Sequence, residues 1–431
     1  MESLVMSHES GPGPGEEGAT RLLTGLVILL GGAAAAGALW WSAISHTRPP
    51  EMPDWTPPTA VRVQPGEDRR YVGAVSCREC HPGESAAFVR SGHARTLRPA
   101  EKDPIARQLD GRTVADPERP GVDWSYHFRD GRLSVDRREG GQTETLPIEF
   151  SFGSGQVGTT FVTTMKPGPG SPPIGLEHRL SYLAAGRKLA ITPGQQKDAS
   201  PEPGSRITPS GRILGAPLLL RCFSCHVTTT SREGHERLDT AAMVPNVSCE
   251  RCHGPASAHI DAARRGGSEE ELRMPMGLDE VSPRDQLAAC GECHRSPDPA
   301  DLASIQEDNL SIVRFQPVGL AKSKCFQEGA SGLRCTSCHD PHARASRDTA
   351  SYEAVCIECH RSGGRAQALC PVSTDEGCVA CHMPRREVTA EFLFTDHWIR
   401  VHPKGPKAAE GPRASGEPAR PAGAGAHALP R

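Results

Sequence analysis

Hydrophobic residues are distributed unevenly along this chain of 431 residues, and a long apolar run lies near its N-terminus. Residues 22–44 carry no charge and are mostly apolar, a length that suits a membrane-spanning helix. Trp40 and Trp41 near one end fit a membrane interface. A cleaved signal peptide is the alternative, with the small residues 33–38 as its cleavage region. We therefore expect residues 21–44 to be a transmembrane anchor or a signal peptide.

A second pattern, alternation of apolar and polar residues, marks residues 110–195. Trp124–Phe128 and Leu133–Val135 are strand-like runs, and Asp130-Gly131 between them is a strong hairpin signal. Further strand-like runs cover residues 147–152 and 159–164. The pattern predicts a small β-rich insertion over residues 110–195.

Short helices are predicted in the rest of the chain. Ser282-Pro283 is a helix start, with an N-cap residue followed by proline at the first helical position. A second helix is expected over residues 349–357. Proline-rich residues 45–70 predict a linker, while residues 1–20 and 403–431 have the composition of disordered termini.

The sequence Cys-x-x-Cys-His occurs seven times, and we number these copies motif 1 to motif 7 in chain order. Their first cysteines are Cys77, Cys222, Cys249, Cys290, Cys335, Cys356 and Cys378; their second cysteines are Cys80, Cys225, Cys252, Cys293, Cys338, Cys359 and Cys381; and their histidines are His81, His226, His253, His294, His339, His360 and His382. This is the attachment signature of c-type haem, in which both cysteine sulfurs bond to the porphyrin and the histidine ligates the iron. The sequence predicts seven covalent haem c groups.

Zinc and thiol redox chemistry explain the motifs less well. A structural zinc ion takes four ligands and has no need for a histidine after every second cysteine. A thioredoxin-like pair would occur once, inside a βαβ unit. Composition also favours haem, because only 36% of the residues are hydrophobic and 4% aromatic, with 45 glycines and 39 prolines. Apolar porphyrins would fill the core that these side chains cannot.

The expected fold is mainly α, with extensive loops around stacked covalent haems, a small β-rich insertion and an N-terminal transmembrane helix. Motif 1 stands alone in residues 71–109, and residues 205–402 form a six-haem domain. The net charge of −3 gives no global field that favours nucleic acid. Two cysteines outside the motifs, Cys325 and Cys370, are predicted to form a disulfide.

The chemistry of each iron depends on its second axial ligand. Four histidines that closely follow a motif are predicted to supply it: His93, His259, His342 and His397. His235 and His402 are weaker candidates, and His127 and His178 in the β-rich insertion are not favoured. The count leaves open whether one iron or more has methionine or no protein ligand at this position.

Three stretches resemble multihaem cytochromes related to cytochrome c-554 and the doubled-motif cytochromes: residues 247–259, 335–342 and 378–384. The resemblance implies paired bis-histidine haems that pass electrons, with His93, His259 and His342 as distal ligands. This superfamily also contains hydroxylamine oxidoreductase and pentahaem nitrite reductase. The chain has no Cys-x-x-Cys-Lys site, and no tyrosine that matches the crosslinking tyrosine of hydroxylamine oxidoreductase, so the resemblance favours electron transfer over catalysis.

Together these observations predict a membrane-anchored heptahaem cytochrome on the periplasmic side. It would relay electrons between redox partner proteins, as a free relay or as a subunit of a respiratory complex. The alternative is an oxidoreductase that acts on a small nitrogen or sulfur compound at one open haem. Secretion after signal cleavage is the alternative for its location.

Overall fold

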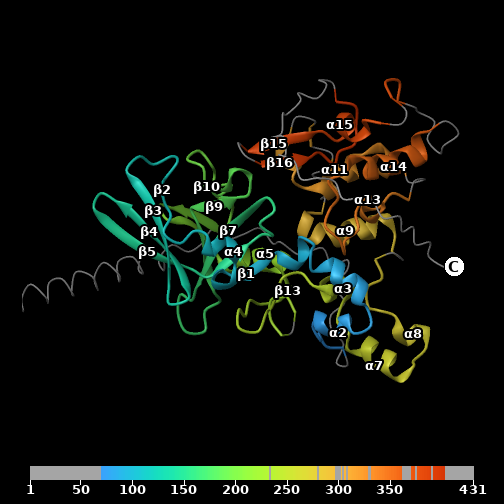
Figure 1. Ribbon diagram of the computed structural model, residues 1–431, viewed down its shortest axis with the longest axis horizontal. Helices are drawn as coiled ribbons and strands as arrows, with labels where there is room; N and C mark the ends of the chain where they lie inside the picture. Colours follow the sequence, from blue (N-terminus) through green and yellow to red (C-terminus); the bar gives the residue numbers. More distant parts are fainter. Residues whose placement is uncertain are drawn as a thin grey trace, which may run out of the picture.

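Strands gather on one side of the molecule, and the helices that carry the motifs lie on the other (Figure 1). The computed structural model describes residues 69–402, apart from residues 233, 279–280, 297–301, 303–304, 307–308, 329–331, 362–369, 374–375 and 390–391. We call residues 97–214 the β unit. The remaining described residues, 69–96 and 215–402, are the motif region.

A four-stranded antiparallel sheet in the order β2-β3-β4-β5 forms the outer layer of the β unit. Its strands are β2 (Thr113–Ala115), β3 (Val122–Arg129), β4 (Arg132–Glu139) and β5 (Gln142–Ile148). Asp130 and Gly131 join β3 to β4 with φ angles of 50° and 74°. Two successive positive φ values are the signature of a type I′ hairpin turn, so the predicted hairpin is confirmed.

An eight-stranded antiparallel sheet forms the inner layer. Its main path runs β1-β6-β7-β8-β12-β11, and β9 pairs with both β7 and β10. The strands are β1 (Leu97–Pro99), β6 (Phe150–Phe152), β7 (Gly158–Met165), β8 (Ile174–His178), β9 (Leu180–Leu183), β10 (Lys188–Ile191), β11 (Ser205–Thr208) and β12 (Gly211–Leu214).

Alternation along the inner strands gives the β unit two hydrophobic cores. In β7, Phe161 is buried against Trp124 and other residues of the outer sheet. The next residue, Val162, is buried on the opposite face, because successive side chains of a strand point to opposite sides. There it joins Leu219 and Phe223 of helix α5 (Ala216–His226). Since α5 ends in motif 2, the inner sheet holds one attachment site directly.

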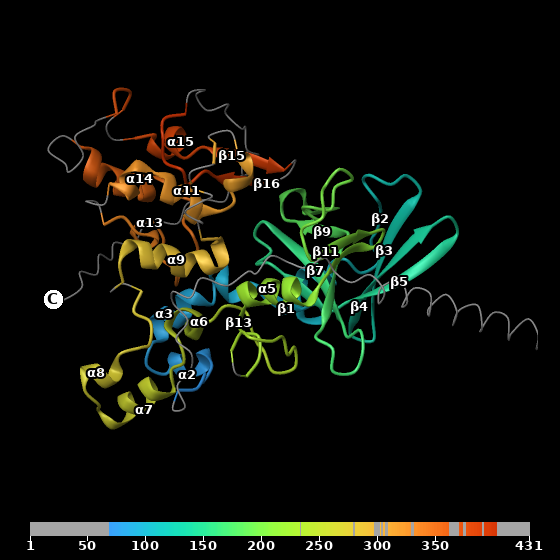
Figure 2. The same cartoon turned by 180° about the vertical axis from the view of Figure 1, so that it is seen from behind.

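Short helices carry the motifs and extend from α7 and α8 at one end of the motif region to α14 and α15 at the other (Figures 1 and 2). The helices are α2 (Ala74–Arg78), α3 (Pro82–Phe88), α6 (Cys249–His253), α7 (Ser257–Arg265), α8 (Glu269–Leu272), α9 (Pro283–His294), α11 (Gln316–Lys322), α12 (Lys324–Gln327), α13 (Cys335–Cys338), α14 (Thr349–His360) and α15 (Cys378–His382). Two hairpins complete it: β13 (Val227–Thr229) with β14 (Val244–Pro245), and β15 (Arg385–Thr389) with β16 (Phe392–Thr395).

Both helices predicted from the sequence are present. The side chain of Ser282 caps α9 by accepting a hydrogen bond from the Asp285 N–H at 3.1 Å. Helix α14 begins at Thr349, and its N-cap Asp348 accepts from the Ala350 N–H at 3.1 Å. These caps satisfy backbone donors that have no partner inside the helix, which explains why local sequence was enough to locate both starts.

The expected fold class is wrong in two respects. Strands are a major component, because the sheets of the β unit run from Leu97 to Leu214 and hold two cores of their own. The expected membrane anchor is not supported either: no helix in the described part of the chain is long and apolar enough to cross a bilayer. Among the described helices α9 and α14 have 12 residues each, whereas a span needs about 20. Residues 21–44 lie outside the described residues.

Candidate metal centres

Five of the seven motifs place both cysteines and the histidine on neighbouring turns of a short helix. Helices α5, α6, α9, α14 and α15 all end at the histidine of their motif. Residues three and four positions apart lie on the same face of a helix, so both sulfurs and the imidazole of one motif face the same side. This is the arrangement that two thioether bonds and one axial ligand to a single haem require.

Four motif histidines face a histidine from a distant part of the chain. The ring centroids are 6.3 Å apart for His81–His259, 6.2 Å for His93–His294, 6.0 Å for His253–His342 and 6.2 Å for His339–His397. A metal–imidazole bond is about 2.0 Å and a ring centroid lies about 1.1 Å behind its nitrogen, so two imidazoles on opposite sides of one metal have centroids about 6.2 Å apart. All four pairs therefore fit a haem iron between them.

Every pair crosses between motifs. His259 follows motif 3 but faces the histidine of motif 1, and His342 follows motif 5 but faces that of motif 3. His397 follows motif 7 and faces the histidine of motif 5. His93, which follows motif 1, faces that of motif 4. All four histidines predicted as second ligands are thus brought opposite a motif histidine, and their role as ligands stays a prediction.

Backbone carbonyls orient several of these imidazoles. The Nδ1 atoms of His226, His382 and His397 donate to the carbonyls of Thr96 (2.9 Å), Arg400 (3.1 Å) and Thr395 (2.9 Å). A carbonyl can only accept, so Nδ1 carries the hydrogen, and Nε2 carries the lone pair that can bind iron. Such a bond fixes the tautomer and the plane of a ligating histidine. His259 does the same with the Leu272 carbonyl at 2.6 Å.

Burial favours the neutral form of the imidazoles, which is the form that ligates a metal. It lowers the pKa of His397 to about 4, because the charged ring would lose its hydration. Burial also lowers the pKa values of His226, His294 and His339.

Two short segments serve two motifs at once. The segment 93–96 begins with His93, which faces His294 of motif 4, and ends with Thr96, whose carbonyl accepts from His226 of motif 2. The segment 397–400 repeats this arrangement: His397 faces motif 5, and the Arg400 carbonyl accepts from motif 7. In each segment the ring and the carbonyl belong to residues three positions apart, so the orientation of one site is tied to that of another.

Motifs 2 and 7 differ from the four paired sites. Within the described residues, neither His226 nor His382 forms a ring pair with a second imidazole; the ring of Phe152 lies edge-on to His226 at 5.1 Å. His402 lies beside motif 7, hydrogen-bonded to the backbone of His382, and its Nε2 is buried without a hydrogen bond. His178 is buried in the β unit with its Nε2 2.9 Å from the Thr163 hydroxyl, and His127 pairs with Asp136 at 3.1 Å.

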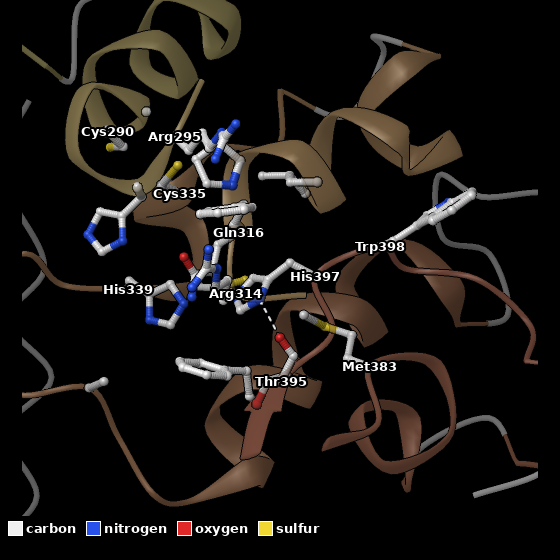
Figure 3. Close-up of a pocket in the computed structure, with 18 of the residues that line it drawn as sticks. Cys290, Arg295, Arg314, Gln316, Cys335, His339, Met383, Thr395, His397 and Trp398 are labelled. Atoms are coloured by element: carbon white, nitrogen blue, oxygen red, sulfur yellow. Dashed lines mark hydrogen bonds between the residues drawn. The ribbon is translucent and has the colours of Figure 1, made fainter. Parts of the chain in front are cut away.

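A cavity of about 4660 Å³ runs through the motif region, lined by both cysteines of motifs 2, 4, 5, 6 and 7 (Figure 3). A pocket for one small molecule measures about 300–1,000 Å³, so this volume fits several large cofactors. Arg295 and Arg314 lie on its wall, with guanidinium carbons 4.6 and 4.7 Å from the centre of the Phe315 ring. Cys325 and Cys370 also line it, and in the structure no disulfide bond joins these two residues, so the predicted disulfide is not confirmed.

Sequence reasoning missed the residues that support these sites. Thr96 and the Arg295–Arg314 pair lie outside any recognisable motif, so no local signal could have found them. Glu250 lies inside motif 3 and is buried, which its position in the sequence does not reveal.

Comparisons with known proteins support haem attachment at the Cys-x-x-Cys-His motifs. Residues 209–254, which contain motifs 2 and 3, match the family model "Cytochrome c554 and c-prime". Residues 326–365, which contain motifs 5 and 6, match the "Doubled CXXCH motif" model. The chain is a multihaem c-type cytochrome, and it binds haem c through its Cys-x-x-Cys-His motifs.

One curated relative is the dissimilatory sulfite reductase MccA of Wolinella succinogenes, which is 26% identical over 188 residues. The match covers 35% of this chain and 24% of MccA, so the chain corresponds to about a quarter of that enzyme. Among solved structures, the outer cell wall cytochrome OcwA aligns with 77% of this chain and 80% of its own, at 14% identity and a TM-score of 0.39.

Proposed function

We propose that this protein is a seven-haem electron relay whose attachment sites follow one continuous order in space. The observation that carries this proposal is the contact between successive motifs. The side chain of Cys77 in motif 1 lies beside that of Cys249 in motif 3. Arg251 in motif 3 pairs with Glu292 in motif 4 at 3.0 Å. Motif 4 then contacts motif 5 through Cys290 and Cys335.

The same order continues to the last motif. Tyr352 of α14, the helix that ends in motif 6, packs against the His339 ring of motif 5 with centroids 5.4 Å apart. The side chain of Cys356 in motif 6 lies beside that of Cys378 in motif 7. Motif 2 joins the path at motif 4, where Cys225 contacts Cys293. The order is therefore 1-3-4-5-6-7 with a branch at 4, and we propose that redox partner proteins dock near motifs 1 and 7.

The paired imidazoles support a relay in particular. Haem iron supplies one-electron chemistry, and an iron with two axial protein ligands has no position left for a substrate. In the proposed arrangement His259, His93, His342 and His397 close the iron sites of motifs 1, 4, 3 and 5. His402 is the best candidate for a further second ligand, because its buried Nε2 faces no hydrogen-bond donor.

Two measurements on the purified holoprotein test this proposal. A pyridine haemochrome assay against protein concentration should give seven haems per chain, and fewer than seven would contradict the count. His259→Ala should convert one low-spin iron to a high-spin iron in low-temperature EPR. His127→Ala, which removes a histidine of the β unit, is the matched control and should leave the spectrum unchanged.

A second function is favoured by the surroundings of motif 2. His226 has an aromatic ring rather than an imidazole beside it, and Arg295 and Arg314 on the cavity wall form no ion pair with a carboxylate within the described residues. Two unpaired guanidinium groups suit an oxyanion. The similarity to a sulfite reductase points to the same chemistry. We therefore keep reduction of a small sulfur or nitrogen oxyanion as the alternative function.

EPR separates the two functions. The relay alone predicts an EPR spectrum that does not respond to added sulfite or nitrite. A high-spin signal that shifts on addition of sulfite or nitrite would establish the reductase instead, provided that the shift is lost in the Arg314→Ala variant.

A further inference from the structure

Glu250, the second residue of motif 3, is a buried carboxylate. Only 3% of its surface is exposed. Carboxylates are rarely buried without a cationic partner, because the loss of hydration is costly. Within the described part of the chain, however, no lysine, arginine or histidine forms an ion pair with Glu250. Its partners are backbone N–H groups, and they come from two segments far from each other in the sequence.

Three donors satisfy the two carboxylate oxygens. Oε1 accepts from the N–H of Val72 at 2.9 Å and from that of Ala256 at 3.0 Å, and Oε2 accepts from the N–H of Gly73 at 2.8 Å. Gly73 is the N-cap residue of α2, and Ala256 is the N-cap residue of α7. The carboxylate therefore takes up backbone donors at the starts of both helices, donors that the helices themselves cannot satisfy.

One of these helices attaches the first haem, and the other holds the imidazole on the opposite side of it. Helix α2 contains Cys77, which attaches the haem of motif 1. Helix α7 contains His259, whose ring faces His81 across 6.3 Å. A second tie reinforces the first, since the Ser257 hydroxyl accepts from the Arg70 N–H at 2.8 Å. One side chain of motif 3 thus sets the separation of the attachment helix and the helix of the opposing imidazole.

The charge of Glu250 lies between two attachment sites. It follows Cys249, whose thiol contacts that of Cys77. Reduction adds an electron to a haem, and a nearby negative charge that neither solvent nor a cation neutralises opposes that addition. A buried carboxylate therefore lowers the reduction potential of an adjacent haem, whereas an exposed one is screened by water.

We propose that Glu250 is a positioning residue of the first haem site. It fixes the positions of α2 and α7 relative to motif 3, and its charge lowers the reduction potential of the first haem site. This inference rests on haem attachment at motifs 1 and 3 and on the axial pairing of His81 with His259. It does not depend on the relay function, so a protein that transfers electrons poorly would leave it standing.

The test uses the full-length holoprotein with Glu250→Gln, which keeps an acceptor oxygen and removes the charge. Spectropotentiometric titration should show the midpoint potential of the first haem site moved upward, with haem content and the low-spin EPR signals unchanged. The His259→Ala variant identifies the haem to which this midpoint belongs. The midpoint of the first site is the one whose low-spin EPR signal is lost in that variant. No upward shift in Glu250→Gln would overturn the proposal.

Glu79 is the matched control, because it lies inside motif 1 itself but has an exposed side chain paired with Arg264 at 3.3 Å. Glu79→Gln removes the same charge and should leave every midpoint in place; a shift as large as that of Glu250→Gln would count against a role for burial. Glu250→Ala removes both N-cap contacts and should turn the first iron high-spin, since α7 no longer holds His259 in place. Unchanged low-spin signals in that variant would overturn the positioning role.

Discussion

The β unit and the motif region are built on different kinds of core. The β unit has two clusters of buried side chains, one between its sheets and one under α5. In the motif region, α14 is 12 residues long and buries none of them, and α2, α3, α13 and α15 also bury no residue. The β unit is therefore stabilised by its own side chains, whereas we expect α14 and the other helices that bury no residue to depend on covalently bound haem.

The largest expected effect is the loss of one haem from the motif region. Replacing Cys356 and Cys359 by alanine removes both attachment bonds of motif 6. Since α14 has no buried residue of its own, its amides should lose their protection in hydrogen–deuterium exchange, while those of the β unit keep theirs. Cys370→Ala, outside the motifs, should change neither haem content nor exchange. If the amides of α14 kept their protection without haem, the helix would not depend on haem for its stability, and the contrast with the β unit would be wrong.

A core truncation in the β unit should destabilise the β unit and leave haem binding in the motif region unchanged. Phe161 is fully buried between the two sheets, so Phe161→Ala should lower the free energy of unfolding of the β unit by about 3–5 kcal/mol. Haem content and EPR spectra should stay as they are. Gln142→Ala on the exposed edge of β5 provides the control. Urea denaturation followed by tryptophan fluorescence measures the effect, and coincident loss of the Soret band would show that the two regions unfold as one.

Acid should act on the β unit through His178. Burial lowers the pKa of this imidazole to about 4, against an ordinary value near 6.5. The unfolded chain therefore takes up the proton first, and stability falls as the pH drops from about 6.5 to about 4, by up to about 3 kcal/mol. His178→Gln should flatten the pH dependence of urea denaturation across this window. An equally steep dependence in that variant would assign the acid sensitivity to another group.

The smallest expected effect lies at the junction of the two regions. Thr96 precedes β1, its hydroxyl donates to the His226 carbonyl at 2.8 Å, and it accepts from the Val247 N–H at 3.1 Å. Thr96→Val removes both bonds and should cost about 1–2 kcal/mol. Because the Thr96 carbonyl also orients the His226 ring, the Soret circular dichroism should change, and Thr96→Ser should restore it. An unaltered spectrum would show that motif 2 is oriented without this junction.

Local features of this protein were predictable from the sequence. The hairpin at Asp130-Gly131 and the capped start of α9 at Ser282 depend on residues a few positions apart, so short-range patterns identify them. The extent of the β unit was not predictable, because β1, β11 and β12 are only 3 or 4 residues long. Such short runs carry little periodicity, and they become strands by pairing with neighbours.

The sequence alone was enough to show that this chain binds haem c through Cys-x-x-Cys-His motifs, because the two cysteines and the histidine of a motif are close neighbours in the chain and form a local signature. It also identified four histidines suited to be second ligands. Only the tertiary structure decided that His259 faces motif 1 rather than motif 3, and that Glu250 holds the helices on both sides of that site. The physical reason is distance along the chain: Val72 and Glu250 are 178 residues apart, and only packing of the whole motif region brings their atoms within 2.9 Å.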